Sequence, residues 1–134
     1  MALQFSDALR NAMLNQIETI GGAAAKVKIY TGTAPANVAA AATGTLLATF
    51  TLASDWMGDA GATLAGRKDF TGTPSTTAVA AGTAAYFRIT TNADVAFMQG
   101  TISTTGADLN LDNTNIANGQ SIQITSWQIT APGA

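Results

Sequence analysis

The stretch AAYFRIT at residues 84–90, followed by TNAD at 91–94 and VAFMQGTIS at 95–103, decides the class of fold. In the first run Phe87 and Ile89 alternate with Tyr86 and Arg88, which is the two-residue period of a β-strand. The four residues TNAD are a turn signal between two β-rich runs. We therefore expect two strands joined by a short turn.

Similar short runs continue on both sides of this pair and are separated by Gly, Asn, Pro and Thr. They lie at residues 26–30, 46–52, 63–70, 107–112 and 121–130. Residues 33–45, with one proline and four consecutive alanines, have the composition of a long surface loop. About eight short strands with regular turn signals are typical of an antiparallel sandwich. The sequence predicts a mainly β protein with a single antiparallel β-sandwich or jelly-roll-like domain.

Only the N-terminus has a helical period. One apolar stripe recurs there at three- and four-residue spacing: Phe5, Leu9, Met13, Ile17 and Ile20. Ser6 is placed to cap the helix, and Gly21-Gly22 is placed to end it. We expect residues 1–22 to form an amphipathic N-terminal helix or arm and residues 23–134 to form the β-sandwich domain. The stripe either docks across a subunit boundary or covers the chain's own domain, and the residues leave both open.

The alternation of the strands also predicts which side chains are buried. The expected core residues are Val27, Ile29, Phe50, Phe87, Ile89, Leu109, Leu111, Ile122 and Ile124. In the last strand Ile122 and Ile124 share a face, while Trp127 and Ile129 fall on the other. A β-bulge near residues 125–126 would turn both pairs inward, or the strand is apolar on both faces.

The composition argues against most catalysis. The chain of 134 residues has no His and no Cys, and only 10% of its residues are charged, with a net charge of −2. Ser-His and Cys-His nucleophile pairs and imidazole or thiolate metal sites are therefore excluded. No basic patch for nucleic acid and no apolar run long enough to span a membrane is present. We expect a protein that is not an enzyme, has no cofactor, and binds neither nucleic acid nor membranes.

Two acidic patterns carry weaker signals. Asp108, Asn110 and Asp112 place oxygens at alternate positions, as in a calcium loop, but the glycine and closing glutamate of such a loop are missing. We expect instead a strand with its leucines inward, no metal site, and no need for calcium in folding. Asp55 and Asp59 flank Trp56, which we interpret as an ordinary loop whose tryptophan is an interface candidate, since strand aromatics more often fill cores or interfaces than bind sugars.

Three segments resemble a known family. They are ATGTLLATF at 42–50, GTAAYFRI at 82–89 and GTISTTGADLNL at 100–111, followed by Ile116, Gly119 and an Ile/Thr-rich final strand. Over about residues 26–130 the chain is similar to small structural proteins from tailed-phage and prophage morphogenesis clusters. The family offers no catalytic residues to carry over.

This resemblance implies a virion protein, made in the host cytoplasm. Our first expectation is a capsid decoration (cement) protein that binds and stabilises the assembled head shell, as a homotrimer in contact with the major capsid protein. A tail or head–tail connector component and a sugar-binding host-adsorption module are the alternatives. The interface candidates are Phe5, Leu9, Met13, Ile17, Ile20 and Trp56.

Overall fold

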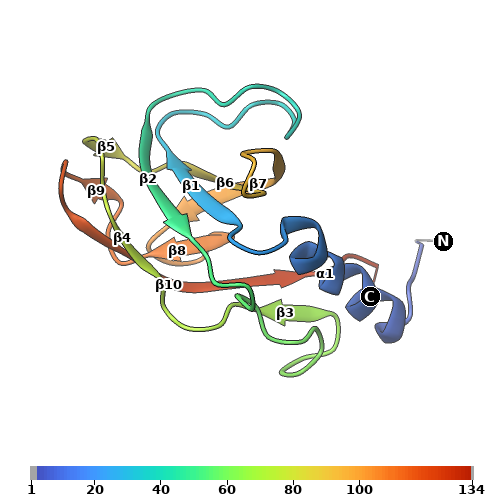
Figure 1. The fold of residues 1–134 in the computed structure, drawn as a ribbon. Helices are drawn as coiled ribbons and strands as arrows, with labels where there is room; N and C mark the ends of the chain where they lie inside the picture. The colour runs from blue at the N-terminus through green and yellow to red at the C-terminus, as the bar shows by residue number, and fades with distance from the viewer. Residues whose placement is uncertain (1–2, 134) are drawn as a thin grey trace.

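The computed structural model describes residues 3–133 and consists of one N-terminal helix followed by short strands (Figure 1). The helix is α1 (Asp7–Gly21). The strands are β1 (Lys26–Tyr30), β2 (Leu46–Thr51), β3 (Arg67–Asp69), β4 (Ser75–Thr77), β5 (Gly82–Thr83), β6 (Tyr86–Thr90), β7 (Ala96–Ser103), β8 (Leu109–Leu111), β9 (Asn115–Ile116) and β10 (Ser121–Thr130). The protein is mainly β, as the alternation predicts. Strands β4, β5 and β9 were not expected, because segments of two or three residues show no period.

Eight strands form one mixed sheet in the order β2-β1-β6-β7-β8-β10-β3, with β4 also pairing β10. Strands β5 and β9 form a separate two-stranded pair. The expected hairpin is present, because β6 and β7 are antiparallel neighbours around residues 91–95. The expectation of a purely antiparallel arrangement is wrong at β7 and β8, which run parallel, with Ile102 opposite Leu109. The sandwich or jelly-roll description stays a prediction.

The large sheet curls so that its two ends approach each other. The hydroxyl of Thr76 in β4 donates to the carbonyl of Thr49 in β2 at 3.1 Å, and the amide of Val79 donates to the carbonyl of Leu47 at 2.8 Å. All nine expected core residues are buried inside this curl, each at most 1% exposed. The prediction of the core is therefore confirmed, although one curled sheet rather than two flat ones encloses it.

Strand β10 contains a bulge, which is one of the two alternatives that its sequence left open. Its register against β8 shifts between Ile124 and Ser126, so Ile124 pairs with Leu111 and Trp127 pairs with Leu109. The extra residue reverses the alternation, and Ile122, Ile124 and Trp127 are all buried. The long loop between β1 and β2 is also present as expected, with no strand in residues 31–45. Within residues 3–133, no helix has the length and hydropathy needed to cross a membrane.

Candidate functional site

The N-terminal helix begins and ends where its sequence predicts. The Ser6 side chain accepts a hydrogen bond from the Leu9 amide at 3.2 Å, which satisfies one of the free N–H groups of the first turn. At the other end Gly22 has φ +66°, and its amide donates to the Glu18 carbonyl at 2.9 Å. A left-handed backbone of this kind favours glycine. The helix packs beside β3 and the end of β10 (Figure 1).

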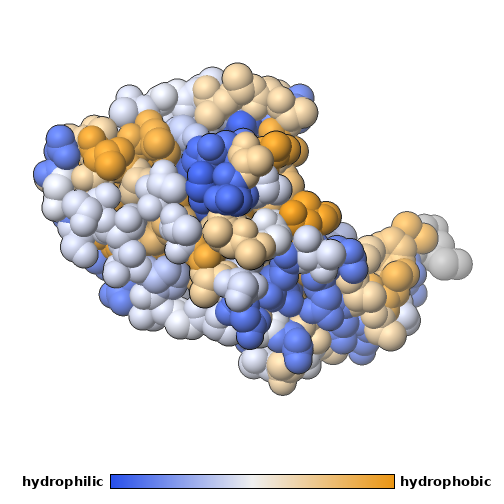
Figure 2. All heavy atoms as spheres, in the orientation of Figure 1, coloured by the Kyte–Doolittle hydropathy of each residue, from blue (hydrophilic) through white to orange (hydrophobic). Residues whose placement is uncertain are grey.

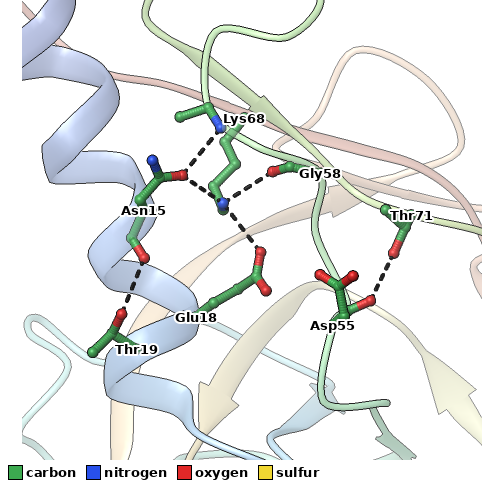
Figure 3. Close-up of polar contacts among 8 residues, drawn as sticks. Asn15, Glu18, Thr19, Asp55, Gly58, Lys68 and Thr71 are labelled. Atoms are coloured by element: carbon green, nitrogen blue, oxygen red, sulfur yellow. Dashed lines mark hydrogen bonds and ion pairs between the residues drawn. The ribbon is translucent and has the colours of Figure 1, made fainter.

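A buried lysine of β3 holds this helix to the sheet (Figure 3). Lys68 is 2% exposed, and its ammonium lies 3.1 Å from Glu18 Oε1 and 2.8 Å from Asn15 Oδ1. A third hydrogen bond of 2.9 Å goes to the carbonyl of Gly58. A buried charge is stable only when it is paired and hydrogen-bonded. These contacts therefore fix which face of the helix turns toward the sheet.

A second anchor lies in the first turns of the helix. Arg10 is 5% exposed, and its Nη2 donates to the carbonyl of Ala131 at 2.8 Å. The neighbouring Asn11 accepts a hydrogen bond from the Gly66 amide at 2.8 Å. Gly66 has φ +74°, and a Cβ built there would overlap the Arg10 guanidinium. The loop before β3 therefore approaches the helix closely because this position has no side chain.

The apolar stripe of the helix is turned mostly outward as a result. Leu9 is 47% exposed, Met13 38% and Ile20 56%, while Ile17 is half-buried and packs against the core. Phe5 is also half-buried, and its ring would contact a Cβ at Gly133. We call Leu9, Met13 and Ile20 the helix stripe. Figure 2 shows hydrophobic residues at the projecting end of the molecule, over the start of α1.

The structure thus separates the interface candidates of the helix into two groups. Leu9, Met13 and Ile20 are exposed, whereas Phe5 and Ile17 are half-buried. The helix packs on its own domain, which is one of the two alternatives that the sequence left open. The contacts come from Arg10, Leu14, Asn15 and Glu18. Within residues 3–133 no other segment covers the helix stripe, so it is exposed to solvent. Periodicity left open whether the stripe meets its own domain or another molecule, and in the structure a different face of the helix, with Arg10 and Leu14 buried, makes the intramolecular contact.

Trp56 was expected to be an interface residue, but it is not on the surface, and this part of the prediction is wrong. Its side chain is 2% exposed and stacks on Trp127, with ring centroids 5.6 Å apart and planes at 12°. Phe70 packs against both indoles, at 5.8 Å from Trp56 and 4.9 Å from Trp127. The bulge of β10 and the loop before β3 bring these rings together, so neither indole offers an open face to a sugar.

The acidic residues singled out in the sequence are dispersed. Asp108 Oδ2 accepts hydrogen bonds from the amide and hydroxyl of Thr101 at 2.9 and 3.0 Å, and Asp112 Oδ1 accepts one from the Gln123 amide at 3.2 Å. Leu109 and Leu111 point inward, as expected for a strand. Asp55 and Asp59 are exposed loop residues. Across residues 3–133, no three His, Cys, Asp or Glu side chains are grouped as metal ligands.

A cleft of about 530 Å³ lies between the loop at residues 31–45 and the outer face of β1 and β6. Its lining consists of Lys28, Tyr30, Val38, Ala39, Ala40, Ala41, Ala42, Arg88, Thr90, Asp94, Val95 and Ala96. The loop arches over the β6–β7 end of the sheet in Figure 1. Tyr86 holds the loop there, since its hydroxyl accepts a hydrogen bond from the Thr43 amide at 2.9 Å and donates to the Thr43 carbonyl.

Arg88 is the buried cation of this cleft. It is 5% exposed, and its Nε and Nη2 donate to Gln99 Oε1 at 3.2 and 3.1 Å. Its Nη2 also lies 3.4 Å from the Asn37 carbonyl, and Gln99 in turn donates to Pro35 at 2.9 Å. The alternation of residues 84–90 placed Arg88 on the outer face, but the loop covers that face, so β6 is buried on both sides.

Asp94 at the β6–β7 turn supplies the negative charge at the cleft. Its Oδ1 lies 2.9 Å from Lys28 Nζ and 3.0 Å from Lys26 Nζ. Hydrogen bonds from Lys28, which has the larger effect, and from Lys26 hold the pKa of Asp94 below its ordinary value of 3.8. Asp94 also has φ +65°, a conformation that aspartate tolerates better than most residues.

Sequence reasoning missed this cleft, because its parts come from three separate strands and a loop without a period. The available signal was Arg88 itself, a cation in the middle of a strand between two aromatic or aliphatic residues. No protein-family model, no curated protein and no solved structure matches the chain.

Proposed function

We propose that this chain is a virion structural protein that acts as a capsid decoration protein, binding the assembled head shell of a tailed phage. The outward helix stripe is the observation that carries the proposal. Contiguous exposed apolar side chains on a folded domain mark surfaces that bind other proteins. A helix with such a stripe fits an apolar groove of a partner, where residues at three- and four-residue spacing act as anchors.

The way the helix is anchored supports a binding role for its stripe. Lys68, Glu18 and Arg10 fix the helix through polar contacts on its inner side. The fold therefore does not need Leu9, Met13 or Ile20 to bury themselves, and their apolar area is available to a partner. The charge-poor, Thr-rich composition and the resemblance to phage morphogenesis proteins favour a partner within a protein lattice. Binding only to the assembled lattice stabilises it by mass action.

The first experiment removes the stripe without unfolding the domain. Deleting residues 1–22 is unsuitable, because it would also remove the buried Leu14 and uncover the part of β3 around Lys68, so a loss of binding could come from a damaged fold. The double variant Leu9→Ser/Met13→Ser changes only exposed side chains, and Val79→Ser, at a position 64% exposed, is the matched control. Each protein is mixed with shells of the major capsid protein of the same virion and sedimented, and its free oligomeric state is measured by analytical ultracentrifugation.

We expect the wild type and Val79→Ser to sediment with the shells and the double variant to bind at least about tenfold more weakly, given the apolar area lost. A double variant that is also reduced from trimer to monomer would place the stripe at the homotrimer contact. A folded double variant that trimerises and binds shells like the wild type would contradict the proposal.

A tail or connector component could use the same stripe and is distinguished by copy number. Saturating stoichiometry with capsid subunits supports a decoration protein, whereas six or twelve copies per particle would indicate a tail or connector role. For a sugar-binding module, the stacked and buried Trp56 and Trp127 are unfavourable, because glycan stacking needs an open aromatic face.

A further inference from the structure

The cleft under the loop at residues 31–45 places two cations side by side. Lys28 of β1 is the direct cross-strand partner of Arg88 of β6. Side chains of directly opposed residues lie on the same face of a sheet, and like charges there destabilise the pair. On its other side Arg88 faces Gln99, which is neutral. The sheet therefore brings two positive charges together at one point of an acidic, charge-poor chain.

Only one of these two cations has an anionic partner. Lys28 pairs with Asp94 at 2.9 Å. Arg88 makes its hydrogen bonds to the neutral oxygens of Gln99 and Asn37, and no carboxylate in residues 3–133 forms an ion pair with it. Its Nη1 makes no hydrogen bond to these residues, and the side chain lines the cleft. A buried guanidinium without a counter-ion is stabilised by an anion that enters the cleft.

From this geometry we infer that the cleft binds a carboxylate carried by an acidic peptide segment, with Arg88 and Lys28 as its ligands. The inference is independent of the proposed capsid role and uses residues outside the helix stripe.

The charge of the lining selects this class of anion. Among the lining residues Lys28 and Arg88 are positive and Asp94 is negative, and Lys26 next to the lining shares the same Asp94 oxygen, so the cluster is positive and attracts an anion. Asp94 repels a phosphate, which carries more negative charge and demands more donors. The remaining wall is small and apolar, with Val38, residues 39–42 and Val95. Such a wall accommodates the aliphatic stem of a glutamate and the neighbouring backbone, and a volume of about 530 Å³ is within the range of a ligand pocket.

The test is a titration of the ¹⁵N-labelled full chain, monitored by NMR. The probes are acetyl-Ala-Ala-Glu-Ala-Ala-amide, the same peptide with Gln in place of Glu, free butyrate, and inorganic phosphate. We expect the Glu peptide to shift the signals of residues 38–42 and the Arg88 Nε–H saturably, with a Kd on the order of 1 mM for so small a probe. The Gln peptide, butyrate and phosphate should each bind about tenfold more weakly or not at all.

Three variants separate a binding role from a structural role of Arg88. Arg88→Gln should weaken binding of the Glu peptide about ten- to one-hundredfold, as expected for loss of a charge-assisted hydrogen bond. Lys28→Gln should also weaken it, and because Lys28 is 19% exposed, this variant tests the site even if Arg88→Gln fails to fold. Arg67→Gln removes an equal charge outside the cleft and should bind like the wild type.

Several outcomes would overturn the inference. Equal binding of the Glu and Gln peptides would show that the carboxylate is not recognised, and no saturable shift would show that Arg88 only clamps the loop. Tighter binding of phosphate would mean that the site selects a different anion. Equal binding of butyrate would refute the peptide assignment in favour of a small carboxylic acid. None of these results bears on shell binding by the helix stripe.

Discussion

The buried ion pair between Lys68 and Glu18 gives the sharpest test of how the helix is held. In Glu18→Gln the Lys68 ammonium stays buried and has only neutral acceptors, the oxygens of Asn15 and Gly58 and the amide oxygen at position 18. Breaking a fully buried pair costs about 3–5 kcal/mol. Because the Glu18 side chain is 20% exposed and these neutral acceptors remain, we expect Glu18→Gln to lower the free energy of unfolding by about 2 kcal/mol.

A double-mutant cycle isolates this interaction. Lys68→Met removes the charge and leaves Glu18 at a position that solvent reaches. The double variant Glu18→Gln/Lys68→Met should be less destabilised than the sum of the single variants, with a coupling energy of about 1–2 kcal/mol. The free energy of unfolding of all four proteins is measured by urea denaturation, with the fluorescence of the two tryptophans as the signal.

The control is a cycle on Lys28 and Asp94, where the carboxylate is 53% exposed. Its coupling should be smaller and should fall in high salt, while that of the buried pair persists. A coupling below about 0.5 kcal/mol for Lys68 and Glu18 would refute the view that this pair anchors the helix.

Three further predictions follow from the fold. Phe87→Ala, measured by urea denaturation, should cost about 3–5 kcal/mol because Phe87 is 1% exposed, and a loss under about 1 kcal/mol would contradict its place in the core. Gly66→Ala should destabilise the protein by about 1–2 kcal/mol more than Gly72→Ala, because both have positive φ but only Gly66 faces the Arg10 guanidinium; equal melting temperatures would contradict this. Because the folded pKa of Asp94 is lowered, its stabilisation is present above the unfolded value of about 3.8 and is lost as the pH falls through the folded value. The stability advantage of the wild type over Asp94→Asn should therefore vanish in acid, and an advantage that persists there would exclude this ion pair as its cause.

The sequence by itself determined the features that depend on neighbouring residues. Ser6 caps the helix because its hydroxyl reaches an amide three residues later. The alternation of the strands identified the buried residues, since successive side chains point to opposite faces whatever the strand pairs with. In β10 the same rule left two alternatives, a bulge or a strand that is apolar on both faces, and the register shift between Ile124 and Ser126 decides for the bulge.

Only the tertiary structure decided the features that depend on distant segments. Lys68 meets Glu18 across 50 positions and Arg10 meets Ala131 across 121, and these contacts set which face of the helix turns inward. The loop at residues 31–45 covers the outer face of β6, which buried Arg88 on a face that alternation assigns to solvent. A period reports which residues share a face, but what covers that face is set by chain segments elsewhere, and the energy of a buried charge depends on which groups those segments bring to it.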